Sequence, residues 1–237
     1  MTCVTRDCPQ YFYDRIADRF EGLDHPLDVR RRLRVVFDEC LGQTPLAGRH
    51  TLDAGCGYGP FSEAAVRRGA IVVSIDIGER LVARTIVRAG SRGFVTDACR
   101  LAIRDESFDL VLSSEMIEHT AAPEAAIDEL ARVLRPDGLL VLTTPNRAWQ
   151  GVVRAATRLG LRPFGGLENF VGWRRLERWC RGAGLEVLLH RGFHPWPFQL
   201  GLSPVARMVE RHLDQGRAAR LMVNQAIVAR KRLTRGV

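Results

Sequence analysis

Three residues with the potential for chemistry lie within five positions of the segment "SSEMIEHT" (113–120). Glu115, Glu118 and His119 stand at offsets of zero, three and four, a spacing that gathers side chains on one face of a helical turn. Two interpretations are open. The cluster is either a divalent-metal site with a catalytic base, or only the charged start of a helix.

A glycine-rich loop, "TLDAGCGYGP" (51–60), is the second feature that could carry chemistry. Gly55, Gly57 and Gly59 permit tight turns and a close approach of the backbone to a ligand. Nicotinamide-binding loops follow G-x-G-x-x-G, but here Pro60 stands at the third glycine and has no N–H to offer a pyrophosphate. The Gly-Lys-Ser/Thr ending of a nucleoside triphosphate loop is also missing from it. The loop therefore disfavours a phosphate ligand.

Acidic residues follow or end three strand-like segments. Asp53 comes just before the glycines, where a carboxylate can meet a cationic amine. Asp76 can accept hydrogen bonds from both hydroxyls of a ribose, and the apolar Ile77 beside it can flank an adenine. Asp97, followed by Ala98, can accept from the adenine amino group. Together they describe a ligand with an amine, a ribose and an adenine but no phosphate, which is S-adenosylmethionine.

The elements that must position these residues follow from the hydrophobic pattern. Buried strands are predicted at 50–54, 71–77, 93–98, 108–114 and 138–145, with helices near 60–69, 79–90 and 123–135. This alternation predicts an α/β fold with a doubly wound, Rossmann-like sheet of parallel strands.

The two ends of the chain add further elements. A helical stretch is expected over 11–41, and two more strands, at 184–193 and 220–232, can pack antiparallel at the sheet edge. "RPDG" (135–138) is expected to end a helix and turn the chain into the next strand.

Composition sets the class of protein. The 237 residues are 46% hydrophobic and 26% charged, as in ordinary globular domains, and no apolar run reaches the length of a membrane span. The N-terminus lacks the pattern of a secretory signal, so a cytoplasmic location is expected. The six cysteines form no CxxC pair, which argues against a zinc ribbon. Only one of the 35 basic residues is a lysine, so the net charge of +8 partly reflects compositional bias.

The segment 50–146 resembles class I S-adenosylmethionine-dependent methyltransferases. The resemblance rests on "LDAGCGYGP", the acidic Asp76, "TDA" (96–98), the run from "FDLVLSSEMIEHT" to "LVLTTPN" and the late strand "MVNQAIVARK". The pattern is most similar to ubiquinone-biosynthesis-type O-methyltransferases. Their Glu-x-x-Glu-His motif after the fourth strand is matched by Glu115, Glu118 and His119.

The resemblance implies one methyltransferase domain over 1–237, built on a seven-stranded, mostly parallel sheet whose last strand runs antiparallel between the fifth and sixth. It divides into a helical cap (1–45), a cofactor-binding core (50–146), a substrate-side insert with edge elements (147–219) and the last strand (220–232). The residues assigned to S-adenosylmethionine are Asp53, Gly55, Gly57, Asp76, Ile77, Asp97, Ala98, Ser114 and Tyr13.

The resemblance also associates a divalent metal with Glu115, Glu118 and His119. Mg²⁺ beside a catechol would lower the pKa of its hydroxyl and position the oxygen. Carboxylates suit Mg²⁺, whereas a histidine ligand would also admit zinc or manganese. The alternative without metal leaves the glutamates at a helix N-terminus and gives His119, with Glu118, the catalytic role.

Segments after 146 are expected to contact the acceptor. Apolar and arginine residues alternate at helical spacing over 147–162, so this helix can lie on an anionic membrane surface or form a lid over the substrate. Phe193, Trp196 and Phe198 on a proline-rich loop could line an apolar acceptor site, and His194 is a second candidate base.

The favoured function is methyl transfer to a small, hydrophobic or phenolic acceptor, with oxygen as the expected methylated atom. Nucleic acid is a less favoured partner, because no Asn-Pro-Pro-Tyr-like turn and no separate RNA-binding module are seen. A non-catalytic cofactor-binding or membrane-associated scaffold is the remaining alternative.

Overall fold

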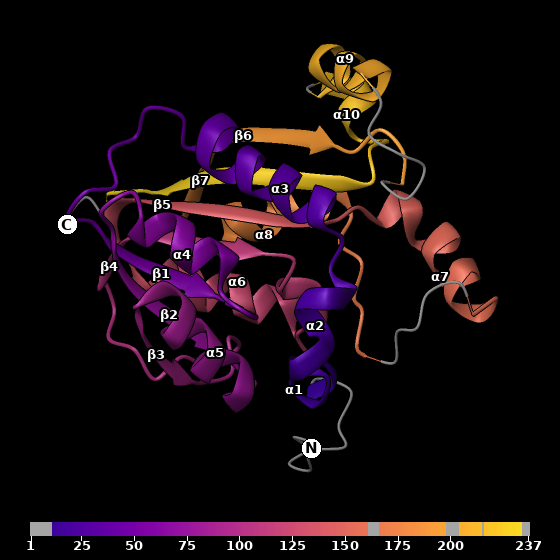
Figure 1. Cartoon of the computed structure of the whole chain (residues 1–237). Coiled ribbons are helices and arrows are strands. Elements are labelled where there is room, and N and C mark those ends of the chain that lie inside the picture. The colour runs from indigo at the N-terminus through magenta and orange to yellow at the C-terminus, as the bar shows by residue number, and fades with distance from the viewer. Residues whose placement is uncertain (1–10, 161–165, 198–203, 215, 234–237) are drawn as a thin grey trace.

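The computed structural model describes residues 11–160, 166–197, 204–214 and 216–233 around one seven-stranded sheet (Figure 1). The strands are β1 (His50–Ala54), β2 (Ile71–Asp76), β3 (Arg92–Val95), β4 (Phe108–Ser114), β5 (Leu134–Pro145), β6 (Leu185–Phe193) and β7 (Asn224–Lys231). Their order across the sheet is β3-β2-β1-β4-β5-β7-β6. Strand β7 is antiparallel to both neighbours, and the other adjacent pairs are parallel. The predicted α/β class and the position of the last strand are confirmed.

Helices cover both faces of the sheet, because its central strands are apolar on both sides. In β4, Leu110 and Leu112 join one buried cluster with Phe61, whereas Val111 joins a second cluster with Ile127. Successive residues of a strand point to opposite faces, which explains this division. The first cluster contains residues of α4 (Pro60–Val66), and the second contains residues of α6 (Pro123–Val133) and α8 (Trp173–Gly182).

The predicted N-terminal helical stretch is divided into several pieces. They are α1 (Phe12–Arg15), α2 (Ala17–Leu23), α3 (Pro26–Arg34) and the π-helical η2 (Val35–Cys40). The other helices are α5 (Glu79–Ala89), the short 3-10 helices η3 (Ile117–His119) and η4 (Arg147–Trp149), α7 (Gln150–Arg158), α9 (Pro204–Leu213) and α10 (Gly216–Ala219). None of the helices in the described residues is long and apolar enough to cross a membrane.

The "RPDG" segment differs from the prediction. Helix α6 ends at Val133 and β5 begins at once with Leu134, so these four residues lie within the strand. Phe108 pairs with Leu134 and Leu110 with Leu139, which makes the segment a bulge rather than a separate turn. Asp137 adopts a left-handed φ of 61° inside this bulge.

Helix α5 fastens the N-terminal cap, which we define as α1 and α2, to the cofactor side of the sheet. Arg80 and Arg84 pair with Asp18, and Arg88 pairs with Glu21 at 2.8 Å. The three arginines recur every four residues and so share one face of α5. Figure 1 shows the cap beside the ends of the central strands.

Candidate active site

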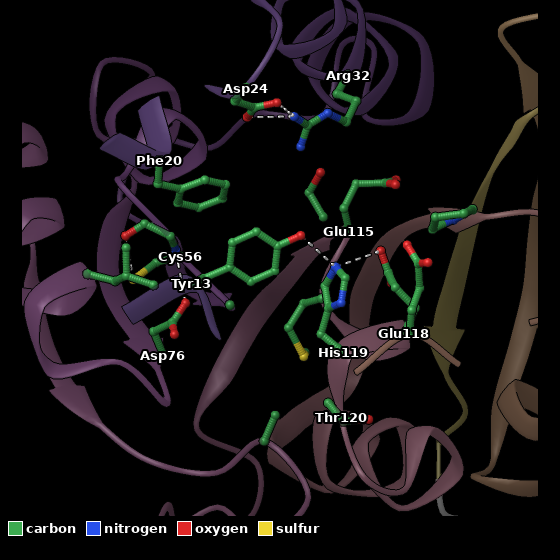
Figure 2. A pocket seen from close by; sticks show the side chains of 18 of the residues that line it. Tyr13, Phe20, Asp24, Arg32, Cys56, Asp76, Glu115, Glu118, His119 and Thr120 are labelled. Atoms are coloured by element: carbon green, nitrogen blue, oxygen red, sulfur yellow. Dashed lines mark hydrogen bonds and ion pairs between the residues drawn. The ribbon is translucent and has the colours of Figure 1, made fainter. Parts of the chain in front are cut away.

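A cavity of about 540 Å³ opens where the central strands end, beneath the N-terminal cap (Figure 2). One half is lined by the glycine loop and by residues that follow β2 and β3. The other half is lined by η3, η4 and α7, and Tyr13 and Phe20 of the cap also contribute to the wall.

The glycine loop needs backbone conformations that other residues adopt only with strain. Gly55, Gly57 and Gly59 have φ values of 75°, 54° and 98°. A Cβ atom on Gly55 would lie 2.2 Å from Cγ of Met116, so the loop also needs glycine for space. The loop therefore lies directly against the "SSEMIEHT" segment.

Asp76 holds the far side of the same loop. Its Oδ2 accepts from the N–H of Gly57 at 3.1 Å, and its Oδ1 accepts from the N–H of Gly78 at 3.0 Å. Burial raises the pKa of Asp76, and these N–H donors lower it again in part. The carboxylate lines the cavity at the end of β2, the position at which an acid can receive ribose hydroxyls.

Four further residues assigned to the cofactor from the sequence also line the cavity: Ile77, Asp97, Ala98 and Ser114. Asp97 accepts the N–H of Cys99 at 2.9 Å, and Ser114 shares a hydrogen bond of 3.0 Å with Thr143. The ends of three strands thus meet at one half of the cavity.

The "SSEMIEHT" segment does not form the helical turn that its spacing suggests. Only Ile117–His119 are helical, as the 3-10 helix η3, and Glu115 precedes it with a left-handed φ of 53°. Helix α6 begins later, at Pro123, so the glutamates do not start it either. All three chemical groups nevertheless line the cavity.

Glu118 is buried and Glu115 is half-buried, and the two share an unusual electrostatic environment. Glu118 Oε2 accepts from Thr144 at 2.9 Å, and Glu115 Oε2 accepts from Asn224 at 2.8 Å. Burial raises the pKa of Glu118 to about 8. Burial, and then the charge of Glu118, raise the pKa of Glu115 well above its usual range. Both groups therefore tend to keep their protons at neutral pH.

The imidazole of His119 has a defined orientation (Figure 2). Its Nδ1 lies 2.7 Å from the carbonyl oxygen of Leu167. A carbonyl only accepts, so Nδ1 carries the proton and Nε2 is the basic nitrogen. Nε2 lies 3.3 Å from the Tyr13 hydroxyl and 3.7 Å from Glu118 Oε1. His119 thus presents a base to the cavity, next to a carboxyl group.

Comparison with known proteins identifies the family. Residues 52–142 match a family model described as a methyltransferase domain. The ubiquinone biosynthesis O-methyltransferase of Hahella chejuensis is 34% identical over 197 residues, which cover 73% of this chain and 82% of that protein. The corresponding enzyme of Xylella fastidiosa is 33% identical over 189 residues, covering 74% and 76%. The chain belongs to the class I S-adenosylmethionine-dependent methyltransferases. The predicted enzyme class and cofactor are thereby confirmed.

Solved structures of methyltransferases share the fold. A structure from Thermotoga maritima, described as a possible histamine N-methyltransferase, matches with a TM-score of 0.69 and 22% identity over 94% of this chain and 99% of that chain. The magnesium protoporphyrin IX methyltransferase of Synechocystis, solved with bound SAH, gives 0.66 and 18% over 94% and 97%.

Asp53 occupies a different position in this methyltransferase from the one predicted. Its carboxylate is buried beneath the loop, is not among the residues that line the cavity, and accepts from Ser62 at 2.6 Å. Burial raises the pKa of Asp53 to about 6. Direct contact with the cofactor amine is therefore not supported by this geometry, and Asp53 instead anchors the loop through Ser62.

The metal prediction meets a mixed test. Oε1 of Glu115 and Oε1 of Glu118 are buried and have no hydrogen-bond partner. A buried oxygen of this kind is expected either where a cation binds or where the carboxyl group is protonated. Within the described residues, however, no three His, Cys, Asp or Glu side chains are grouped so that they could hold one metal ion. The predicted three-ligand set does not fit a metal as these side chains stand.

The N-terminal helices supply charged groups that the sequence did not single out. Arg32 lines the cavity and donates to Asp28 at 2.8 Å and to Asp24 at 2.9 Å. His194, considered from the sequence as a second base, is buried against Asp28 at 2.9 Å and does not line the cavity. Burial alone would raise the pKa of Asp28, but Arg32 and His194 bring it below its usual value. This cluster, visible in part in Figure 2, closes the top of the cavity beside Glu115.

The half of the cavity beyond η3 is mainly apolar. Trp149, Val152, Val153, Ala156 and Phe170 line it, so the apolar side of α7 contacts the cavity as a lid would. Val152 is still 53% exposed, and Arg154 and Arg158 on the same helix are exposed.

The aromatic loop contributes less than expected. Phe193 is packed in the core and does not line the cavity, nor does Trp196. Pro197 does line it, whereas Phe198, like Arg162 of the predicted lid, lies outside the described residues.

Proposed function

We propose that this enzyme methylates a hydroxyl group of a small, apolar or phenolic acceptor. The observation that carries the proposal is the position of His119: its basic Nε2 lines the cavity between the cofactor half and the apolar half. The names of the ubiquinone biosynthesis O-methyltransferases that the chain resembles support oxygen as the methylated atom.

The apolar half of the cavity supports the acceptor class. An aromatic ring or short hydrocarbon would bury its surface against Trp149, Phe170 and the apolar side of α7. Glu168 also lines the cavity, and its carboxylate disfavours an acceptor that carries its own carboxylate close to the hydroxyl.

The reaction is a single displacement. When bound, S-adenosylmethionine supplies a methyl group on a positively charged sulfur. The acceptor oxygen forms the new O–CH₃ bond while the S–CH₃ bond breaks and its electron pair stays on sulfur. The proton of the hydroxyl group moves to Nε2 of His119, as in general base catalysis.

Two neighbours orient and stabilise His119 in this role. The Leu167 carbonyl fixes the proton on Nδ1, which keeps Nε2 available. Glu118, 3.7 Å from Nε2, stabilises the imidazolium when its own carboxyl group is ionised. No step in this mechanism passes through a metal, and metal dependence stays a prediction for experiment.

The proposal is tested by transfer of labelled methyl groups to a panel of phenols and catechols, including one with a prenyl chain. Chelator-stripped protein is assayed with and without added Mg²⁺. Transfer to a phenolic oxygen, reduced about a hundredfold or more by His119→Ala with unchanged cofactor affinity, is the expected result. Asp76→Ala is the matched control, because it should weaken cofactor binding instead. Failure of every hydroxylated acceptor, with transfer to an amine, would refute oxygen as the target.

Peripheral contact of 147–162 with an anionic membrane is retained as a prediction. The exposed Val152, Leu159 and the arginines of α7 support it, whereas the apolar residues that face the cavity support the lid interpretation. Retention of the protein by anionic vesicles, lost on Val152→Asp and Leu159→Asp, would test it.

A further inference from the structure

A second hollow, of about 500 Å³, lies apart from the active-site cavity and is lined by five arginines. We call it the arginine groove. Its arginines come from three separate segments: Arg147 from η4, Arg174, Arg175 and Arg178 from α8, and Arg220 from the chain before β7. None of its lining residues is acidic. These segments are far apart in the sequence, and only the structure brings them together.

Many of the other described arginines pair with acids, whereas the five arginines of the groove do not. In the part of the chain that the structure describes, none of the five forms an ion pair or donates a side-chain hydrogen bond, and all five are exposed. By contrast, Arg181 on the same helix pairs with Glu177 at 3.3 Å. Positive charges gathered around one hollow repel each other unless an anion lies between them.

The nearest acid in the helix does not neutralise the groove. Glu177 accepts from Trp173 Nε1 at 3.0 Å and lies 3.0 Å from His190 Nδ1. These contacts direct its carboxylate toward β6 and away from the arginines. The start of α8 adds to the positive field, because Gly172 offers no capping side chain and the first turn contains no acid.

Hydrogen bonds from the buried Asn146 hold the walls of the groove in place. Asn146 donates to the carbonyl oxygens of Arg220 at 2.7 Å and Met222 at 3.1 Å, and accepts from the N–H of Ala148 at 3.1 Å. The N–H of Arg147 donates to Val171 at 3.2 Å. The backbones that carry Arg147 and Arg220 are thus fixed relative to α8, as a binding site requires.

We propose that the arginine groove binds a small phosphate-bearing anion, of the kind found in a diphosphate or in a phospholipid head group. Guanidinium groups form paired hydrogen bonds with phosphate oxygens, and five of them suit a ligand with more than one phosphate charge. The groove is distinct from the site of methyl transfer, since Arg147 and Ala148 line it while Trp149 lines the cavity. A diphosphate group and a phospholipid head group share this chemistry.

The test measures the binding of pyrophosphate, the soluble probe, to the full chain by calorimetry at constant ionic strength. The double substitution Arg174→Gln/Arg178→Gln should raise the Kd by at least about tenfold. The matched control, Arg92→Gln/Arg104→Gln, removes the same charge from two exposed arginines outside the groove and should leave the Kd unchanged. Unchanged S-adenosylmethionine affinity in both variants shows that the fold is intact.

A second arm distinguishes the sources of phosphate. Co-sedimentation with phosphatidylglycerol vesicles, compared with phosphatidylcholine vesicles, tests a lipid head group. Binding to either probe that depends on Arg174 and Arg178 supports the site. The probe that binds shows whether the phosphate comes from a soluble diphosphate or from a lipid head group. Absence of binding to both probes, or an equal loss in the control variant, would overturn the proposal. Binding of a single-stranded RNA oligonucleotide alone would overturn it in favour of a nucleic-acid surface.

Discussion

The hydroxyl group of Tyr13 lies 3.3 Å from Nε2 of His119, although 106 residues separate them in the chain. Their rings meet edge to face, with centroids 5.0 Å apart. Because Tyr13 belongs to the N-terminal cap, the cap contacts the nitrogen that we propose as the base. An acceptor hydroxyl has to share or replace this contact when it binds.

Tyr13→Phe should therefore separate two roles of this residue. It removes the hydroxyl from Nε2 but keeps the ring that packs on Phe20 at 4.6 Å. We expect unchanged cofactor affinity and an altered KM for the acceptor. Tyr13→Ala, which also loses the ring, should weaken cofactor binding by several-fold. Equal effects of both substitutions on cofactor affinity would contradict this division, as measured by calorimetry and steady-state kinetics.

The rate of the enzyme should rise with pH through the pKa of Glu118. Burial raises that pKa to about 8, and we expect the ionised form to stabilise the imidazolium of His119. The value of kcat/KM should climb and reach a plateau above about pH 8. Glu118→Gln should lower the plateau and remove this limb. A variant with the same profile as the wild type would rule out Glu118 as its origin.

Stability should change in the opposite direction over the same range. The pKa of Glu118 is higher in the folded protein than the ordinary value of 4.5, so the unfolded chain loses the proton first as pH rises. The contribution of Glu118 to stability is greatest below about pH 4.5 and is lost progressively up to about 8. The Tm of Glu118→Gln should fall less between pH 5 and pH 8 than that of the wild type, in thermal unfolding experiments. Parallel pH dependence in the two proteins would contradict the shift.

Gly55→Ala should abolish measurable cofactor binding for two separable reasons. The added Cβ would lie 2.2 Å from Met116 Cγ, and alanine at a φ of 75° is strained by about 1–2 kcal/mol. Cβ of Met116 would also lie 2.5 Å from the added atom, so the double variant Gly55→Ala/Met116→Gly, which removes both Met116 atoms, relieves the clash but not the strain. We expect it to recover binding in part, by calorimetry. Full loss in the double variant would assign the whole effect to the backbone, and full recovery would assign it to the contact.

Cofactor affinity should depend on salt through the arginine row of α5. Each exposed ion pair between α5 and the cap contributes only about 0.2–1 kcal/mol, so Arg84→Ala should raise the Kd for S-adenosylmethionine by about twofold to fivefold. Arg67→Ala is the control, since Arg67, which follows the last residue of α4, pairs with Glu63 of that helix and not with the cap. Calorimetry at low and high salt should show a smaller salt effect in Arg84→Ala than in either control or wild type. An identical salt effect in Arg84→Ala and the wild type would show that the ion pairs between α5 and the cap do not contribute to cofactor affinity.

The sequence was sufficient for the features that are encoded locally. The glycine loop, the acid that ends β2 and the alternation of strands and helices depend on short-range patterns, and they occur where predicted. The cavity wall also includes Arg32 from α3 and Asn224 from β7, whose contacts with the site arise from tertiary packing. No local pattern ties these residues to Glu115, although a polar pair at 224 and 225 inside an apolar strand was a signal that could have been noticed.

Two predictions from sequence spacing differ from the structure, and in each a backbone or side-chain interaction of the folded chain sets the position of the residue. The spacing of Glu115, Glu118 and His119 predicted one helical turn, but the positive φ of Glu115 turns the chain out of β4 first. Asp53 stands at the expected position in the loop, yet its hydrogen bond with Ser62 draws it beneath the cavity wall. Both differences come from side-chain and backbone geometry that sequence spacing does not contain.

The insertion of β7 between β5 and β6 has a consequence for synthesis on the ribosome. In the part of the chain that the structure describes, β6 pairs only with β7, and Asn224 at the start of β7 donates to Glu115 in the cavity. During translation, β6 therefore has no native partner strand until β7 has been synthesised. The cofactor half can form from the earlier segments, whereas the acceptor half is completed only at that stage. A nascent chain that lacks β7 should accordingly bind S-adenosylmethionine but transfer no methyl group to an acceptor.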